Sequence, residues 1–124
     1  MSTDTHRVRA LRGAITVDRD EPDEVRAATE ELLTELFERN GVRTEDIVSV
    51  LFTATPDLSS EFPAVAARAL GLSDVPLLCA AEIAVPDALP RCIRVLVHLY
   101  SKRAAGELRH VYLRDARALR TDLE

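Results

Sequence analysis

The hydrophobic positions of the chain first follow the period of a strand and then the period of a helix. Residues 7–17 divide their apolar side chains between two faces, which predicts a strand. In residues 22–40 the apolar positions recur three or four residues apart, which predicts an amphipathic helix. Pro22 suits the first turn of this helix, and Asn40-Gly41 suits its end. The apolar stripe consists of Val25, Ala28, Leu32, Leu33, Leu36 and Phe37.

The rest of the chain carries mainly strand patterns. Mostly apolar runs predict four further strands, at residues 46–55, 75–85, 91–100 and 108–114. A loop and a shorter helix that ends at Gly71 separate the first two of these runs. The elements together predict a single α+β domain over residues 1–124, with a five-stranded mixed sheet, two main helices and a ferredoxin-like arrangement. The ends, residues 1–6 and 115–124, are expected to be flexible.

The number of helices also bears on assembly. Two helices cannot cover both faces of a five-stranded sheet, and a sheet of apolar strands needs both faces covered. The second face is therefore expected to pack against another copy of the chain. The sequence predicts an oligomer.

Composition narrows the classes of function. Hydrophobic residues make up 47% and charged residues 30% of the 124 positions, as in ordinary globular domains. No apolar run approaches the ~20 residues that span a bilayer, and the first residues lack a signal peptide, so a cytoplasmic protein without a membrane partner is expected. The net charge of −5 argues against a nucleic-acid partner but leaves room for a local arginine cluster that binds a small anion. Cys79 and Cys92 lie in apolar stretches without metal-ligand spacing and are expected to be free thiols.

Four polar residues interrupt apolar stretches and are candidates for chemistry. Arg94 lies inside "RCIRVLVHLY", a pattern typical of a strand buried on both faces, where an unpaired guanidinium costs several kcal/mol. Glu82 is the lone carboxylate of "LLCAAEIAV", and Arg12 precedes Gly13, where a ligand could approach the backbone closely. Tyr112 lies in "RHVYLR". Ordinary alternatives stay open for three of them: an edge-strand arginine in solvent for Arg12, a strand-end carboxylate for Glu82 and a core side chain for Tyr112.

Several common kinds of catalytic machinery have no counterpart in the sequence. His6, His98 and His110 form no spacing typical of a metal site, and no serine lies in a nucleophile-elbow sequence. The four glycines form no phosphate-binding loop. Arginines near one carboxylate, without a nucleophile, favour electrostatic catalysis or the binding of an organic anion.

Five segments in unbroken order, between about residues 9 and 123, carry a resemblance to a known family. They are "LRGAITVDRDE", "LFTATPDLSSEFPAVAAR", "VPLLCAAEIAV", "RCIRVLV" and "RHVYLRDARALRTDL". Together they resemble the monofunctional, trimeric α/β class of chorismate mutase. The resemblance implies a trimeric pseudo-α/β barrel with active sites between adjacent subunits. It also implies the conversion of chorismate to prephenate on the route to phenylalanine and tyrosine, without cofactor or metal.

The resemblance assigns roles to individual residues. It implies that Arg94 and Glu82 are catalytic and that seven residues bind the substrate: Arg12, Phe62, Arg68, Cys79, Tyr112, Leu119 and Arg120. In this scheme Arg12 pairs with a substrate carboxylate, and Cys79 and Glu82 contact the substrate hydroxyl. Phe62 and Arg68 lie near the mouth of the cleft, and the stretch with Leu119 and Arg120 closes over the site. The chain departs from the family pattern at Val65 and Leu78, where a family member carries lysine and threonine.

The chemistry of this reaction agrees with the residues. Chorismate is a dicarboxylate, and its one-step pericyclic rearrangement needs neither a nucleophile nor a proton shuttle. The breaking ether bond leaves negative charge on the oxygen, which a fixed arginine stabilises, and positive charge on the ring, which a carboxylate stabilises. Two alternatives also use an arginine to hold a carboxylate: a small trimeric imine-deaminase-like enzyme, and a regulatory module that binds an aromatic amino acid.

Overall fold

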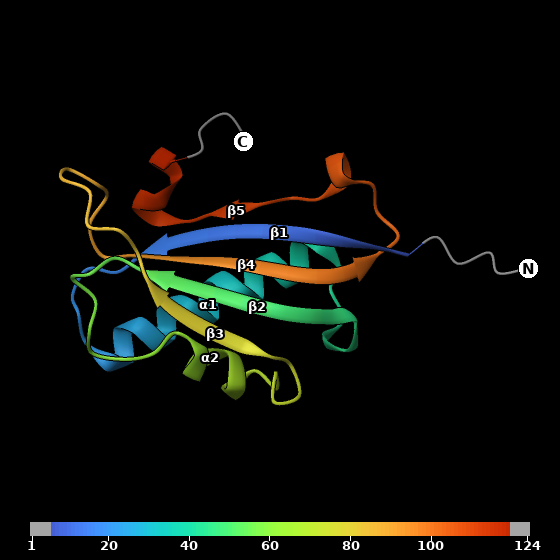
Figure 1. Cartoon of the computed structure of the whole chain (residues 1–124), viewed down its shortest axis with the longest axis horizontal. Coiled ribbons are helices and arrows are strands. Elements are labelled where there is room, and N and C mark those ends of the chain that lie inside the picture. Colours follow the sequence, from blue (N-terminus) through green and yellow to red (C-terminus); the bar gives the residue numbers. More distant parts are fainter. Residues whose placement is uncertain (1–5, 120–124) are drawn as a thin grey trace, which may run out of the picture.

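A five-stranded mixed sheet forms the frame of the molecule. A computed structural model of the chain describes residues 6–119. The strands are β1 (Arg7–Thr16), β2 (Ile47–Ala54), β3 (Leu77–Ala81), β4 (Cys92–Ser101) and β5 (Val111–Tyr112). Their order in the sheet is β3-β2-β4-β1-β5 (Figure 1). Because β4 runs antiparallel to β1 and β2 while β3 and β5 run parallel to their neighbours, the predicted mixed sheet is confirmed.

Both α-helices lie on the same face of the sheet (Figure 1). α1 (Pro22–Asn40) begins with the predicted proline, followed by the acidic Asp23 and Glu24, which the helix dipole favours there. It ends at Gly41, whose φ of 58° suits a residue without a side chain. α2 (Ala64–Ala69) is a short helix in the crossover from β2 to β3. Three short 3₁₀ helices complete the described elements: η1 (Thr44–Asp46), η2 (Ala105–Glu107) and η3 (Arg114–Leu119). Within residues 6–119, no helix is long and apolar enough to cross a bilayer.

The main core lies between the sheet and α1. It contains the predicted apolar stripe of the helix, of which Leu32, Leu33 and Leu36 are fully buried. Gly13 faces this core, because a Cβ atom there would lie 3.0 Å from Leu32 Cδ1 and 3.1 Å from the carbonyl oxygen of Val111. The glycine therefore lets α1 and β5 approach β1 closely. A ligand's approach to the backbone of Gly13 stays a prediction.

The opposite face of the sheet is open in the single chain. Along β4 the side chains alternate: Ile93, Val95, Val97 and Leu99 are buried, whereas Arg94 and Tyr100 are exposed. The prediction that residues 91–100 are buried on both faces is therefore wrong for one chain. The reason is that both α-helices pack on one side. The uncovered face that the sequence predicts is confirmed.

The connectivity differs from a ferredoxin-like fold. The described elements follow the order β-α-β-α-β-β-β, and α2 joins β2 to its parallel neighbour β3. A ferredoxin-like chain has the order β-α-β-β-α-β, so that label is wrong for this protein. What the two arrangements share is the split unit in which α1 joins two parallel strands, β1 and β2, with β4 between them.

Two predicted strands are shorter than expected, and the tail is partly helical. The strand expected at 75–85 pairs only over Leu77–Ala81, and the one expected at 108–114 pairs only over Val111–Tyr112. The residues that follow form η3, in which Ala116 is fully buried against Ala14 and Cys92. Mobility of the tail without ligand stays a prediction, and residues 120–124 lie outside the described part of the chain.

Candidate active site

The open face carries a row of side chains set by the register of the sheet. Arg94 pairs with Ala14 on one side and with Thr53 on the other, so all three side chains lie on this face. Tyr112 lies opposite Ala14 and extends the row across β5. Arg12 lies one row further along β1, opposite Leu96. β5 pairs with β1 only at Gly13 and Ala14, so Arg12 lies just beyond this pairing, and its side chain is exposed.

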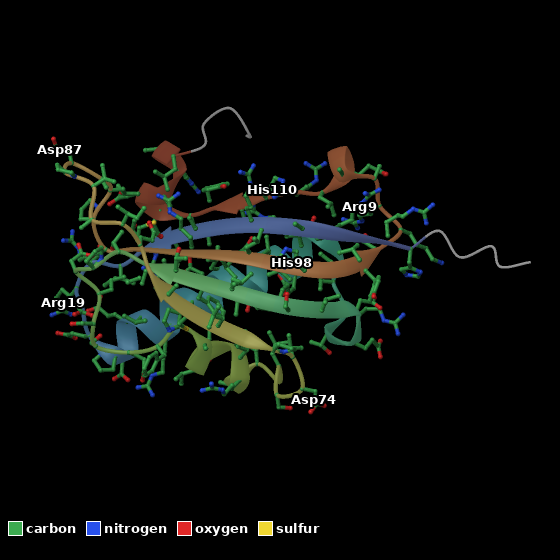
Figure 2. The ribbon with its side chains drawn as sticks, in the orientation of Figure 1. Arg9, Arg19, Asp74, Asp87, His98 and His110 are labelled. Carbon is green, nitrogen blue, oxygen red and sulfur yellow. The ribbon has the colours of Figure 1, made fainter. Side chains whose placement is uncertain are left out.

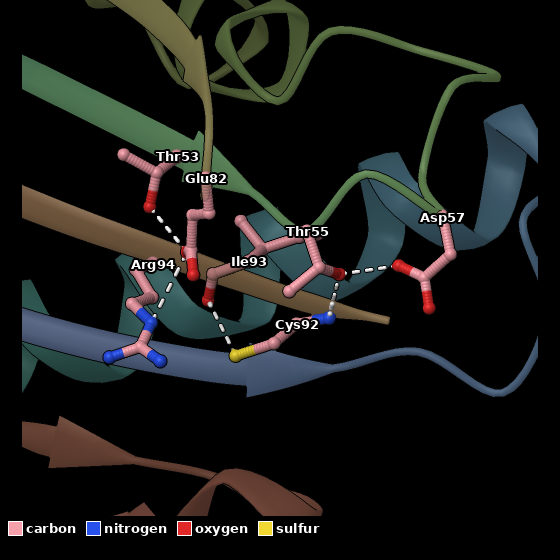
Figure 3. Close-up of polar contacts among 7 residues, drawn as sticks. All are labelled: Thr53, Thr55, Asp57, Glu82, Cys92, Ile93 and Arg94. Carbon is pink, nitrogen blue, oxygen red and sulfur yellow. Dashed lines mark hydrogen bonds and ion pairs between the residues drawn. The ribbon is translucent and has the colours of Figure 1, made fainter. Parts of the chain in front are cut away.

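Glu82 lies directly after β3 and joins this row. Its backbone N–H donates to the carbonyl of Ala54 at 2.9 Å, which extends the pairing of β2 and β3 by one residue. Its Oε2 accepts a hydrogen bond from Thr53 Oγ1 at 2.6 Å and lies 3.2 Å from Arg94 Nε (Figure 3). Only 18% of the Glu82 side chain is exposed, against 46% of the Arg94 side chain. The pair therefore holds the carboxylate in place and leaves the outer part of the guanidinium in solvent.

The position of Arg94 explains why β4 can contain an arginine. Arg94 is neither unpaired nor buried, because it points to the open face and pairs with Glu82. Since the ion pair uses Nε, the two terminal amino groups of the guanidinium retain donors for a ligand.

A hollow of about 460 Å³ lies over this part of the face. Of the nine residues predicted for the site, it contains Arg12, Arg94, Tyr112 and Leu119 in its lining. The other lining residues are Gly13, Leu51, Thr53, Val95 and Leu96. Two arginines in a mainly apolar hollow suit an organic anion that carries carboxylate groups on an apolar ring.

Cys92 lies beneath the charged pair. The residue is fully buried and packs with Ala14 and Ala116. Burial raises the pKa of its thiol to about 11, although the nearby Arg94 acts in the opposite direction. Both cysteines are free thiols, as predicted, and Cys92 is held neutral at physiological pH.

A second hollow, of about 430 Å³, adjoins the first at Thr53 and contains two more of the predicted residues. Phe62, 69% exposed, lines it from the loop before α2, and Cys79 lines it from β3. Cys79 pairs with the buried Phe52 and shares its face of the sheet, so its side chain does not point toward Arg94. Arg68 is exposed on α2 and lines neither of these two hollows. Arg120 lies outside the described residues.

The two positions that depart from the family pattern fall in different places. Leu78 is 59% exposed on the open face, opposite Leu51. Val65 is half-buried on α2. Within residues 6–119, no group of three or more His, Cys, Asp or Glu side chains could hold a metal ion.

Thr53 is the polar residue of the site that the sequence did not single out. It lies in the strand "DIVSVLFTAT" and shares an oxygen of Glu82 with Arg94. A threonine is a common strand residue, so composition gives no signal. Only the register, which places Thr53 opposite Arg94, brings it into the network.

Comparison with known proteins decides the family. The family model of chorismate mutase type I matches residues 8–123. The chain belongs to this family. It is 51% identical over 118 residues to chorismate mutase AroH of Thermus thermophilus, covering 94% of this chain and 97% of that protein. It is 42% identical over 117 residues to chorismate mutase AroH of Bacillus subtilis, covering 94% of this chain and 92% of that protein.

A solved structure agrees with the sequence relatives. A chorismate mutase from Clostridium thermocellum is similar in structure, with a TM-score of 0.87 and 44% identity, over 88% of this chain and 97% of that chain. The resemblance carried by the five sequence segments is therefore confirmed, and so are the enzyme class, an isomerase, and the chorismate mutase activity. Of the three functions considered from sequence, family membership favours chorismate mutase over the imine-deaminase-like enzyme and the amino-acid-binding module.

Proposed function

We propose that this chorismate mutase converts chorismate to prephenate in the hollow on the open face, by electrostatic stabilisation of the transition state and without a cofactor. The observation that carries the proposal is the contact of Glu82 Oε2 with both Arg94 Nε and Thr53 Oγ1, at 3.2 and 2.6 Å. This contact fixes a positive and a negative group a few ångströms apart. The rearrangement also develops one negative and one positive charge, which these two groups can stabilise.

The arginine acts on the breaking bond. As the ether C–O bond lengthens ahead of C–C bond formation, the oxygen gains negative charge. The terminal amino groups of Arg94 donate hydrogen bonds to that oxygen, and the bonds strengthen as the charge grows. Glu82 accepts a hydrogen bond from the ring hydroxyl and faces the positive charge that develops on the ring. The contact of Glu82 with Arg94 fixes the two groups relative to each other, so little reorganisation is needed during the reaction.

Other residues of the hollow hold the substrate in its reactive conformer. Arg12 lies one row from Arg94 on the neighbouring strand and pairs with a carboxylate of chorismate. Tyr112 and Leu119 close the side of the hollow formed by β5 and η3. Leu51 and Leu96 provide an apolar floor for the ring. Holding the flexible side chain compact over the ring removes part of the entropic barrier.

In the proposed assembly, a second subunit supplies three of the remaining predicted residues: Phe62, Arg68 and Cys79. Phe62 and Cys79 line the adjoining hollow, and Arg68 lies on the helix that covers the other face of the sheet. If these side chains contact the substrate, as the resemblance implies, a neighbouring copy supplies them. A homotrimer closed as a pseudo-α/β barrel provides such a neighbour for every site and covers the open face at the same time. The function is then that of a cytoplasmic enzyme of phenylalanine and tyrosine biosynthesis.

The test of this function follows the loss of the diene absorbance of chorismate with three proteins: the parent chain, Arg94→Ala and Arg94→Lys. Loss of one donor at a developing oxyanion costs about 3–4 kcal/mol, or roughly 10²–10³ in kcat. Lysine keeps the charge but not the planar fork, so Arg94→Lys should recover little of the activity. Because Arg94 is half-exposed, both variants should fold about as well as the parent. A folded Arg94→Ala protein with parental kcat would contradict the mechanism.

A further inference from the structure

The start of β4 is bound by side chains as well as by the strand ladder. Thr55, which follows β2, is buried and donates its backbone N–H to the carbonyl of Cys92 at 3.0 Å. In return, Thr55 Oγ1 accepts the backbone N–H of Cys92 at 2.9 Å (Figure 3). Both the N–H and the C=O of Cys92, the first residue of β4, are thus hydrogen-bonded to Thr55. Arg94 follows two residues later and lies on the same face as Cys92.

A carboxylate completes this arrangement. Thr55 Oγ1 donates to Asp57 Oδ1 at 2.5 Å. The second oxygen of Asp57 accepts the backbone N–H of Arg91 at 2.9 Å. Asp57 therefore fixes the hydroxyl that holds Cys92 and also the amide of the preceding residue. Both carboxylate oxygens of Asp57 are thus engaged by Thr55 and Arg91, and Asp57 lines neither of the two hollows described above.

The residue that Asp57 holds has an unfavourable backbone conformation. Arg91 has a φ of 48°, a region that residues with a side chain rarely adopt. Such a conformation persists only where several contacts fix it. Here the carbonyl of Arg91 accepts from Val17 N, and Arg91 Nε donates to the Val17 carbonyl, both at 3.0 Å. Together with Asp57, these contacts fix the turn that leads into β4.

We propose that Asp57 is a positioning residue for Arg94: through Thr55 and Arg91 it fixes where β4 begins, and so where the guanidinium lies. The proposal rests on the catalytic role of Arg94 proposed above. Without the carboxylate, the turn at Arg91 relaxes toward negative φ and displaces the start of β4. A displacement of about 1 Å at a reacting group is enough to reduce a rate roughly 100-fold.

The first test compares Asp57→Asn with the matched control Asp87→Asn. Asparagine has one acceptor oxygen where aspartate has two, so either Thr55 or Arg91 faces an N–H₂ group instead of an acceptor. Asp87→Asn removes the same charge from an exposed position in the loop before β4, also at positive φ (Figure 2). We expect kcat to fall roughly 10- to 100-fold in Asp57→Asn, with a small change in KM, and to stay at the parental value in Asp87→Asn.

A second test asks whether the effect passes through Arg91 and Arg94. Glycine adopts positive φ without strain, so Asp57→Asn with Arg91→Gly should regain most of the lost kcat. In an Arg94→Ala background, Asp57→Asn should lower kcat no further, because residues that act through one another are not additive. Parental kcat in folded Asp57→Asn, no rescue by Arg91→Gly, or full additivity with Arg94→Ala would each overturn the proposal.

The outcome separates this inference from the proposed function. If Arg94→Ala reduces kcat strongly and Asp57→Asn does not, Arg94 is catalytic and Asp57 does not position it. If Arg94→Ala itself keeps parental kcat, the proposed mechanism fails and this inference fails with it. Thermal unfolding of each variant provides the check on folding. A purely structural role would lower the melting temperature and leave kcat of the folded protein unchanged.

Discussion

At the scale of single residues, the charged pair of the site depends on a neutral neighbour. Thr53 Oγ1 and Arg94 Nε both donate to the same oxygen of Glu82. The hydroxyl fixes the carboxylate from the side of β2, and the guanidinium fixes it from β4. The negative charge that faces the ring in the proposed mechanism is therefore held on a defined atom.

Replacing Glu82 with glutamine tests that charge. The amide has nearly the same shape and can still accept a hydrogen bond, but it carries no charge. We expect kcat to fall more than KM rises, because the charge matters most when the ring becomes positive. Steady-state kinetics with chorismate give both constants, and Thr53→Ser, which keeps the hydroxyl, is the matched control. An unchanged kcat in Glu82→Gln would return Glu82 to a strand-end carboxylate without a catalytic role.

The buried thiol beneath the pair gives a prediction that does not depend on catalysis. Burial raises the pKa of Cys92 from 9.0 to about 11, so the thiolate fraction near pH 8 is about 100-fold lower than in the unfolded chain. The stability that comes from keeping this thiol neutral is fully present below pH 9 and is lost as the pH rises toward 11. In a Cys79→Ala protein, iodoacetamide should alkylate Cys92 at least 100-fold faster after unfolding. Equal rates for folded and unfolded protein, measured by mass spectrometry, would contradict the burial.

At the scale of elements, the close packing of three elements depends on one glycine. Gly13 of β1 lies where a Cβ atom would be 3.0 Å from Leu32 of α1 and 3.1 Å from the backbone of Val111 in β5. The side chain of Leu32 can move, but the backbone carbonyl of Val111 can do so only if β5 shifts. Since Tyr112 of β5 lines the hollow, the packing on the helix side also affects the site on the open side.

Gly13→Ala tests this close approach. Overpacking in a well-packed core typically costs 1–3 kcal/mol, and we expect a loss of about 2 kcal/mol in the free energy of unfolding. Gly106→Ala is the matched control, because a Cβ atom there would meet nothing within 4 Å and the φ is ordinary. Denaturant unfolding of both variants gives the comparison. Equal stability of the two variants would show that the sheet shifts at no cost.

The elements also show what a sequence pattern can and cannot predict. α1 was predictable because its buried stripe and its polar face differ clearly along the chain. The one-sided burial of β4 was not, because Leu96 and Tyr100 on the open face are also large and apolar. A strand that faces a core on one side and a subunit interface on the other has the same apolar sequence pattern as a strand in the middle of a core. The contact of Glu82 with Arg94 joins β3 and β4 across β2, so it becomes visible only when the sheet order is known.

At the scale of the whole molecule, the open face of the sheet exposes apolar side chains that no helix covers. Large apolar side chains are exposed on it: Val8 at 55%, Tyr100 at 50% and Leu78 at 59%. They belong to β1, β4 and β3, three of the five strands of the sheet (Figure 1). Exposed apolar side chains of this size favour an interface between subunits.

The assembly is tested by mass. We expect light scattering at micromolar concentration to give three times the mass of the 13.7 kDa chain. Leu78→Asp places a charge on the open face and should shift the mass toward the monomer, with loss of activity in proportion. Lys102→Asp, an exposed change in the turn after β4, is the control for added negative charge. A stable monomer with full activity would contradict both the trimer and the shared site.

The strongest test of a shared site mixes two inactive variants. In the proposed trimer, each site takes Arg94 from one subunit and Arg68 from its neighbour. A trimer made of Arg94→Ala and Arg68→Ala chains therefore contains some sites in which both arginines are present. Random mixing at equal amounts gives intact pairs at about a quarter of the sites, because each half is intact with a probability of one half. We expect the mixture, after joint unfolding and refolding, to regain up to about a quarter of parental kcat, whereas each variant refolded alone stays inactive. If Arg68 and Arg94 served a site within one chain, no mixture could combine them, and the activity would stay at the level of the separate variants.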